Sequence, residues 1–171
     1  MKIEIWTDIA CPFCYIGKRR FEVGLQDFEH KDEVEITFRA FPLDPSAQKN
    51  TGKDIHQILS EKHGIPYSKA KELNGQMAAQ AAAEGLNYQF DSMIPTNTSD
   101  ALRLAYYAKS YNKMNEYMDR VFKAYFTDSL DIGDHVILAK LASEIGLDES
   151  EALRNVTTDR YLEELQKDRA L

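Results

Sequence analysis

The sequence predicts an α/β fold that opens with a strand, a helix and a second strand and continues as an all-helical block. Residues 2–8 and 34–40 alternate apolar and polar side chains, which is the period of a half-buried strand. From residue 46 onward only helical periodicity is found. At 171 residues the chain is long enough to bury a normal core as one domain with a large insertion.

A helix is predicted between the two strands. Phe21, Leu25 and Phe28 recur at helical spacing within residues 17–29. Because a strand, a helix and a strand in succession form a βαβ unit, we expect two parallel strands with a right-handed crossover. Two strands alone make a marginal sheet, so we also expect something beyond these segments to complete it.

The helical block contains recognisable starts and stops. Gly85 and Gly146 each follow an apolar run of helical period and suit the position just past a helix end. Asn97, Asp134 and Asp148 precede such runs and are predicted to be N-caps. These signals divide the block into several helices.

Two further helical segments bear on function and on the C-terminal end. Tyr117, Val121, Phe122 and Tyr125 form a stripe that we interpret as packing between helices in preference to a cofactor pocket. Residues 158–171 are predicted to form one more amphipathic helix, which has no capping glycine.

Composition and charge exclude several classes of function. The net charge of −7 lacks the basic footprint of a nucleic-acid binder. No stretch approaches the roughly 18 uninterrupted apolar residues of a membrane span, and the first residues alternate where a signal peptide needs a continuous apolar run. We therefore expect a cytoplasmic protein with neither nucleic acid nor a membrane as partner.

The two cysteines, Cys11 and Cys14, admit four interpretations. A disulfide closing so short a loop would stabilise the fold by only about 2 kcal/mol, which argues against a structural staple. A zinc site needs four ligands, and His56 and His63 lack the usual spacing of a histidine pair, so we interpret them as surface residues and expect no metal. Inert burial would place the cysteines within a strand or helix stripe, which is not their position.

A redox pair remains as the favoured interpretation. Cys11 follows a strand and Pro12 suits the first position of a helix, so the helix N-terminus should lower the pKa of Cys11. Cys14, one turn later, would resolve a mixed disulfide formed at Cys11. Phe13 has either an ordinary packing role or a substrate-facing one, and Asp8 is either a turn or capping residue or a proton relay.

Four stretches carry a resemblance to a known family: "IEIWTDIACPFCYIGKRRFE", "FRAFPLDP", "PTNTSDALRLAYYAK" and "FKAYFTDSLDIGDHVILAKLASEIGLD". Together they resemble the DsbA-like thioredoxin superfamily, specifically its FrnE-like thiol-disulfide oxidoreductases. The resemblance implies a thioredoxin-like α/β fold with a helical insertion, redox residues at Cys11 and Cys14, and Pro12 and Phe13 as the variable dipeptide.

The resemblance also divides the chain. It implies a thioredoxin-like N-terminal half over residues 1–45, a helical insertion domain over residues 46–157, and a linking helix over residues 158–171. No proline occurs after Pro95, so the family's cis-proline loop and C-terminal thioredoxin strands are expected to be absent from this chain, as in a truncated member. A homodimer is one way in which the sheet could be completed.

The same fold resembles kappa-class glutathione transferases and 2-hydroxychromene-2-carboxylate isomerases, which have a serine where Cys11 stands. Their similarity to the stretch around Asn97 would place that residue near the thiol site, beside its interpretation as an N-cap. The principal hypothesis is a thiol-disulfide oxidoreductase or isomerase that needs no cofactor and acts on protein or small-molecule thiols and disulfides. Alternatives are a glutathione-dependent transferase or isomerase, with glutathione as co-substrate, and a non-catalytic redox-sensing module.

Overall fold

The computed structural model of the protein describes residues 1–170. The elements in chain order are β1 (Lys2–Thr7), α1 (Pro12–Gln26), the 3₁₀ turn η1 (Lys31–Glu33), β2 (Glu35–Ala40), α2 (Ile55–His63), α3 (Tyr67–Ala83), α4 (Ser99–Lys109), α5 (Met114–Phe126), α6 (His135–Glu144), α7 (Glu149–Thr157) and α8 (Leu162–Ala170). Strand, helix and strand are thus followed by helices alone, which confirms the predicted fold class.

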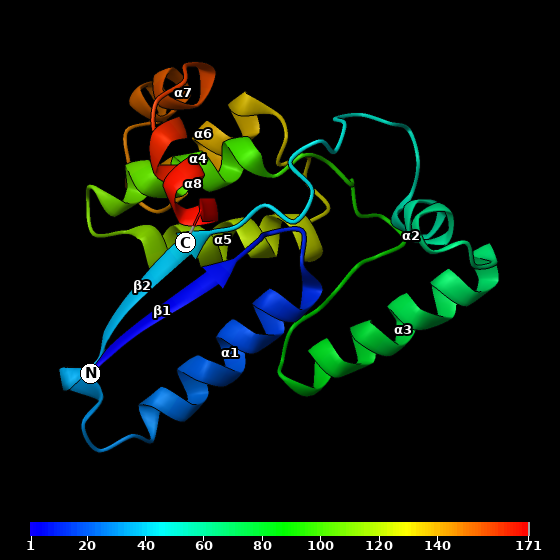
Figure 1. Ribbon diagram of the computed structural model, residues 1–171, viewed down its shortest axis with the longest axis horizontal. Helices are drawn as coiled ribbons and strands as arrows, with labels where there is room; N and C mark the ends of the chain where they lie inside the picture. The colour runs from blue at the N-terminus through cyan, green and yellow to red at the C-terminus, as the bar shows by residue number, and fades with distance from the viewer. Residues whose placement is uncertain (171) are drawn as a thin grey trace.

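β1 and β2 pair in parallel, as the βαβ pattern predicts. Their register runs from Lys2 opposite Glu35 to Thr7 opposite Ala40. Over residues 1–170 the sheet consists of these two strands. Figure 1 shows α1 on one side of the strands, α4 to α8 gathered on the other, and α2 with α3 standing apart as a helical pair.

The core lies mainly among the helices that follow residue 98. The largest fully buried side chains include Tyr107 of α4, Phe122 of α5 and Leu138 of α6. The stripe on α5 is entirely buried, which confirms its interpretation as packing between helices for Tyr117, Val121 and Phe122, whereas Tyr125 also lines a pocket.

An aromatic cluster joins the cysteine-bearing helix to this core. The Tyr15 ring of α1 stacks on Phe122 with centroids 4.8 Å apart, and Tyr88 stacks on Phe126 at 4.4 Å. Such pairs contribute beyond the area they bury. The start of α1 is therefore held against α5 and against the segment that connects α3 to α4.

The C-terminal helix is shorter than predicted. α8 begins at Leu162 because Tyr161 has a left-handed backbone (φ 62°) that cannot continue a helix. Leu171 lies outside the described residues. Asp168 fastens α8 to the strands, since its carboxylate accepts hydrogen bonds from Arg39 at 2.8 Å and from the Ala40 N–H at 3.3 Å.

Two other expectations need correction. The first helix begins at Pro12, as the proline predicts, but it ends at Gln26 instead of extending to residue 29, and Phe28 lies beyond it with 42% of its surface exposed. His56 is not a surface residue. It is buried, with Nε2 2.9 Å from Asp91 and Nδ1 2.9 Å from the Asn74 amide, because a polar ring can enter a core when both nitrogens find partners.

The predicted caps are largely correct. The carboxylates of Asp134 and Asp148 accept N–H groups of the first turns of α6 and α7. Gly85 and Gly146 follow α3 and α6 with φ of 73° and 86°, the left-handed region that glycine adopts without strain. Among residues 1–170, no helix is both long and apolar enough to cross a bilayer.

Candidate active site

Cys11 stands at the junction between β1 and α1. It is the N-cap of α1 with an extended backbone (φ −89°, ψ 112°), and Pro12 is the first helical residue. The Cys11 N–H donates to the Asp8 carbonyl at 3.2 Å, which closes a tight turn after β1. The predicted strand, Cys-Pro and helix junction is therefore confirmed, and the cysteine faces the positive end of the helix dipole.

Cys14 lies one turn further along α1 and contacts Cys11. Its N–H donates to the Cys11 carbonyl at 3.0 Å, both thiols are free, and each lies close enough to shift the pKa of the other. The Cys14 side chain packs against the hydrophobic core. The structure thus brings the two sulfurs together, with Cys14 on the inner side.

The contact between the thiols separates their pKa values. The hydrogen bond from Cys11 lowers the pKa of Cys14 to about 6 against the opposing effect of burial, and the Asp8 N–H and Thr7 hydroxyl add to the lowering. The same thiol contact, with burial, raises the pKa of Cys11 and outweighs the N–H groups of Phe13 and Cys14 that lower it. The lowered pKa thus belongs to Cys14, contrary to the expectation for Cys11.

Asp8 is buried and organises the backbone around the cysteines. Its carboxylate accepts hydrogen bonds from the Ala10 N–H at 3.2 Å, the Leu43 N–H at 2.7 Å and the Thr98 hydroxyl at 2.6 Å. These contacts support its interpretation as a turn residue, and a role as proton relay stays a prediction. Leu43 and Thr98 are 35 and 90 residues away in sequence, so no local pattern could have identified them.

A pocket of about 480 Å³ opens beside Cys11, between the motif and the α2–α3 pair. Cys11 lines it, whereas Cys14 does not. Its apolar wall includes residues of three segments, the loop after β2, α2 and the connection from α3 to α4: Leu43, Ile55, Ile58, Leu59, Phe90 and Met93. A molecule in this pocket would therefore meet the Cys11 sulfur in apolar surroundings.

Charges of both signs surround the same pocket. Lys53 pairs with Glu61 at 2.7 Å, and Lys62 lowers the pKa of Asp44, although the Ser46 hydroxyl contributes most to that lowering. Because cations and anions are mixed, the pocket shows no strong preference for one sign of ligand charge.

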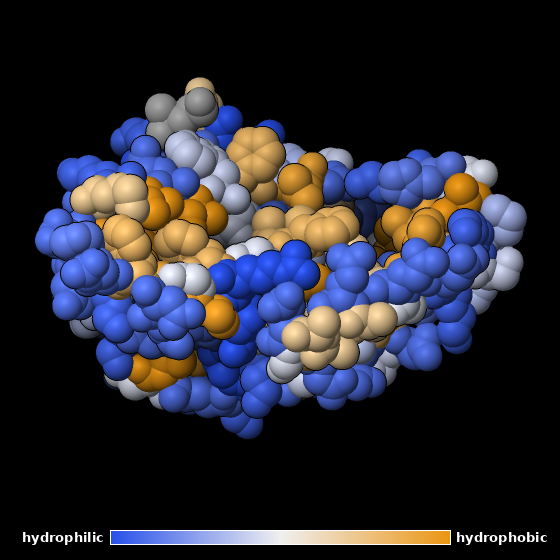
Figure 2. All heavy atoms as spheres, turned by 90° about the horizontal axis from the view of Figure 1, so that it is seen from below, coloured by the Kyte–Doolittle hydropathy of each residue, from blue (hydrophilic) through white to orange (hydrophobic). Residues whose placement is uncertain are grey.

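A larger pocket of about 710 Å³ lies away from the cysteines. Its apolar residues come from α1, β2 and α5, among them Phe21, Ile36 and Met114. Figure 2, seen from the side of α1, shows apolar residues gathered in hollows between hydrophilic stretches. Neither cysteine lines this larger pocket, so we place the candidate chemistry at the smaller one.

Asn97 and Phe13 take different positions around the motif. The Asn97 amide donates to the carbonyls of Pro45 and Ala47, and its oxygen accepts the N–H of Ser99, the first residue of α4. The N-cap of α4 is Thr98, so the prediction that Asn97 is the cap is wrong by one residue. Asn97 joins the start of α4 to the loop after β2 and does not line the pocket. The Phe13 ring is 60% exposed beside the cysteines, which leaves both of its proposed roles open.

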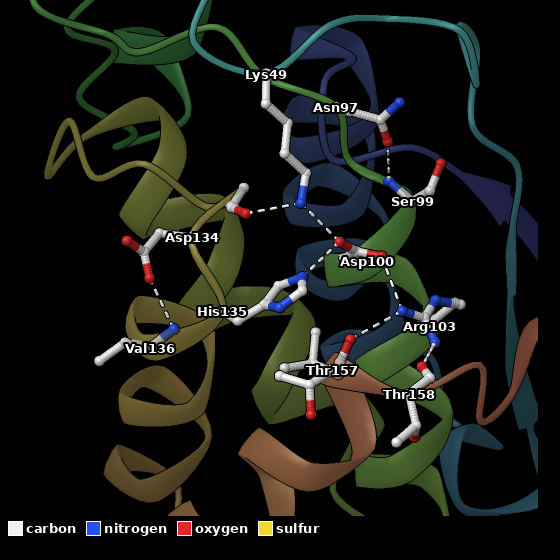
Figure 3. A network of polar contacts seen from close by, with 12 residues as sticks. Lys49, Asn97, Ser99, Asp100, Arg103, Asp134, His135, Val136, Thr157 and Thr158 are labelled. Carbon is white, nitrogen blue, oxygen red and sulfur yellow. Dashed lines mark hydrogen bonds and ion pairs between the residues drawn. The ribbon is translucent and has the colours of Figure 1, made fainter.

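Lys49 anchors the same loop at a second point (Figure 3). Its ammonium group lies 2.7 Å from the Asp100 carboxylate and donates to the Gly133 carbonyl at 2.9 Å. Asp100 also accepts from Arg103 at 2.8 Å and contacts His135 at 2.7 Å. Burial alone would raise the pKa of Asp100, but these three partners together hold it well below its usual range. The loop that forms one pocket wall is therefore tied to α4 and α6.

The described part of the chain, residues 1–170, shows no cluster of three or more histidine, cysteine or acidic side chains suited to a metal ion. The arrangement of one sulfur facing a pocket, with a second sulfur in contact behind it, is suited to exchange of disulfide bonds.

Comparison with known proteins agrees with this geometry. A family model described as DSBA-like thioredoxin domain matches residues 2–171. The uncharacterized protein YwbO of Bacillus subtilis is 34% identical over 151 residues, which are 85% of this chain and 66% of the relative. The chain thus spans just under two thirds of the length of that curated relative.

Two solved structures show the same architecture. A probable DsbA oxidoreductase from Streptomyces coelicolor superimposes with a TM-score of 0.92 at 37% identity, over 99% of this chain and 74% of the other. The cytosolic disulfide reductase DsbM from Pseudomonas aeruginosa gives a TM-score of 0.67 at 10% identity, over 99% of this chain and 77% of the other. The second similarity shows the fold alone.

Proposed function

This chain belongs to the family of DSBA-like thioredoxin domains, and we propose that it exchanges disulfide bonds through Cys11 and Cys14. The observation that carries the proposal is the placement of the pair. Cys11 lines a pocket at the N-terminus of α1, while Cys14 contacts it from the core side. One sulfur is accessible to a substrate, and the other is positioned to displace that substrate.

The reaction proceeds in two displacement steps. The Cys11 sulfur attacks one sulfur of a substrate disulfide, its proton passes to the thiolate of Cys14, whose pKa is lowered to about 6, and the second substrate sulfur leaves as a thiolate. Cys14 then loses that proton to solvent and attacks Cys11, which forms the Cys11–Cys14 disulfide and releases the remaining substrate thiolate. The substrate is reduced by two electrons and the protein is oxidised, and the reverse sequence oxidises a dithiol.

The test is capture of the intermediate with a labelled peptide disulfide. We expect Cys14→Ser to accumulate a mixed disulfide at Cys11, because the resolving sulfur is absent, and Cys11→Ser to accumulate none. The double variant Cys11→Ser/Cys14→Ser is the matched control without thiols, since the chain contains only these two cysteines. Equal rates of peptide reduction in the wild type and in the double variant would refute the proposal.

A second candidate is glutathione-dependent transfer or isomerisation. It is supported by the apolar pocket beside Cys11 and by the fact that DsbM, which shares the fold, has been solved with GSH. Glutathione could equally serve the first function as co-substrate. If Cys14→Ser retains full activity toward a small aromatic substrate in the presence of glutathione, the second candidate is favoured over disulfide exchange.

For compartment and partners we propose the cytoplasm and the thiols or disulfides of proteins or small molecules. The paired free cysteines and a chain long enough to fold without a staple support this assignment, and DsbM is itself described as cytosolic. Cell fractionation that finds the native protein in an oxidising compartment outside the cytoplasm would contradict this assignment.

A further inference from the structure

The α2–α3 pair forms one side of the pocket beside Cys11. Figure 1 shows the pair standing apart from α4 to α8, and α2 packs mainly against α3. The apolar side chains that α2 contributes to the pocket are Ile55, Ile58 and Leu59. The width of the pocket therefore depends on where the pair is held relative to the cysteines.

Two connections join the pair to the rest of the fold. The chain enters α2 through residues 41–54, the entering connection, and leaves α3 through residues 84–98, the leaving connection. Both connections also line the pocket, the first with Leu43 and Ala47 and the second with Phe90. The way in which they are fastened thus decides both the position of the pair and the shape of the pocket.

Asn97 fastens the two connections to each other. Its amide group donates to the carbonyls of Pro45 and Ala47, at 3.0 Å and 2.8 Å, in the entering connection. Its side-chain oxygen accepts the N–H of Ser99 at 2.9 Å, a contact that Figure 3 shows at the start of α4. Because α4 is largely buried in the core, one side chain holds the entering connection against the rigid part of the molecule.

The entering connection has two further fastenings on the same side of the pair. The Leu43 N–H donates to the buried Asp8 carboxylate at 2.7 Å, and the Lys49 ammonium group donates to the Gly133 carbonyl at 2.9 Å. Asn97 differs from both, because it lies at the end of the leaving connection. It therefore links the segment before α2 directly to the segment after α3.

We propose that Asn97 is a positioning residue for substrate selection, which holds the α2–α3 pair so that the pocket fits a large apolar group beside the sulfur that reacts with Cys11. The inference deepens the proposed disulfide exchange and rests on it. A wall that is already in place need not be ordered when the substrate binds, so affinity is gained. Releasing the wall should weaken binding of the apolar group without changing the chemistry at the sulfur.

The substrate class that this pocket fits is a peptide disulfide with a large apolar side chain next to its cysteine. Its volume of about 480 Å³ has apolar side chains from α2 and from both connections. Charges of both signs line the same pocket, among them Lys53 and Glu61, so ligand charge contributes little to selection. A peptide with polar neighbours beside its cysteine would gain nothing from the apolar wall.

Asn97→Asp removes one half of the joint and keeps the other. The carboxylate still accepts the Ser99 N–H, but it has no donor for the two carbonyls of the entering connection. The matched control is Asn155→Asp. The Asn155 amide also donates to a carbonyl, that of Glu151 at 2.8 Å, and its oxygen accepts from Arg160 at 3.2 Å. Asn155 lies in α7, which does not line the pocket.

The experiment compares two peptide disulfides. One is the disulfide-linked dimer of a short peptide with leucine on both sides of its cysteine, and the other has serine in place of leucine. Reduced glutathione at one fixed concentration returns the oxidised protein to the dithiol and is itself oxidised. We expect the wild type to reduce the leucine peptide with a kcat/KM at least about fivefold higher than that for the serine peptide.

The variants should separate position from stability. In Asn97→Asp, KM for the leucine peptide should rise at least about fivefold, which is about 1 kcal/mol at 1.4 kcal/mol per tenfold change. Its kcat should stay within about twofold of the wild type, because the lost binding is uniform. Asn155→Asp should keep the wild-type preference for leucine. An equal loss of preference in both variants, or none in Asn97→Asp, overturns the inference.

A second readout follows the wall without turnover. Amide hydrogen exchange in residues 41–63 should become at least about threefold faster in Asn97→Asp and stay unchanged in Asn155→Asp. Exchange in this segment that matches the wild type in Asn97→Asp overturns the inference. If Asn97→Asp fails to fold, Asn97→Ser replaces it with the same expected results, since its hydroxyl can accept the Ser99 N–H but is too short to hold both carbonyls.

Failure of the proposed function would look different. A wild type that reduces neither peptide would contradict disulfide exchange, whereas hydrogen exchange would still report whether Asn97 holds the entering connection. A wild type that reduces both peptides with equal kcat/KM would contradict the inference alone.

Discussion

Replacement of Asp100 by asparagine tests how the loop beside the pocket is held. The substitution keeps the size of the side chain but removes the charge that Lys49, Arg103 and His135 surround. Arg103 is the partner most affected, because its side chain is only 8% exposed. Its remaining hydrogen bonds go to backbone carbonyls in and after α7, which cannot neutralise it.

The expected loss of stability lies between two limits. Breaking a fully buried ion pair costs about 3–5 kcal/mol, whereas an exposed pair contributes about 0–1 kcal/mol. The Asp100 side chain is 20% exposed, and its partner Lys49 is 39% exposed whereas its partner Arg103 is 8% exposed. Solvent therefore screens the Lys49–Asp100 pair more than the Arg103–Asp100 pair. We expect Asp100→Asn to cost about 2–3 kcal/mol, which lowers the melting temperature by roughly 4–12 °C for a chain of this size.

The stability lost in Asp100→Asn should depend on pH, and the depressed pKa of Asp100 gives the direction of that dependence. The pKa of Asp100 is depressed in the folded protein, so its stabilisation is complete above the unfolded value, about 3.9, and is lost as pH falls below it toward the folded value. The difference in unfolding free energy between wild type and Asp100→Asn should therefore be about 1 kcal/mol smaller at pH 3 than at pH 7.

Urea denaturation at the two pH values measures both quantities. The control is Glu72→Gln, because Glu72 pairs with Lys69 at 3.0 Å and the two side chains are 53% and 49% exposed. We expect the control to cost less than about 0.5 kcal/mol at either pH. A cost for Asp100→Asn no larger than that of the control, or one that is equal at pH 3 and pH 7, would refute the reasoning.

Two further predictions concern close packing and the thiols. A Cβ at Gly133 would lie 2.2 Å from the Thr96 hydroxyl, so Gly133→Ala should cost about 1–3 kcal/mol. That hydroxyl is buried and has no hydrogen-bond partner among residues 1–170, so Thr96→Ala should recover most of the loss when the two substitutions are combined in a double-mutant cycle. An equal cost of Gly133→Ala with and without Thr96→Ala would contradict the clash. Cys11→Ala removes the donor that lowers the pKa of Cys14 to about 6, so the alkylation midpoint of Cys14 should rise toward that of an ordinary thiol, and a midpoint that stays near 6 would contradict the contact.

Local sequence patterns were sufficient where the cause of a structure is itself local. Alternation identified both strands, and Pro12 after Cys11 identified the start of α1, because a proline has no N–H to lose at the first helical position. Asp134 and Asp148 could be recognised as caps because the backbone N–H groups that their carboxylates accept lie only two or three residues further along the chain.

Patterns failed where distant segments determine the environment of a side chain. From the sequence alone His56 was interpreted as a surface residue. It is buried because Asn74 and Asp91, both from other segments, are partners for its two ring nitrogens. The pKa assignment for the cysteines was reversed because it considered the helix dipole but not the hydrogen bond between the thiols.

The proposed reactive pair lies within four consecutive residues, whereas its surroundings arise from the fold. Asp8, Leu43 and Thr98 meet, and Tyr88 reaches Pro12, only after the helical segments pack against the βαβ unit. Spacing along the chain determines contacts within one turn of a helix, but contacts between segments depend on packing, which no local pattern records. For this reason the sequence could point to the two candidate sulfurs, and the tertiary structure was needed to identify the residues that surround them.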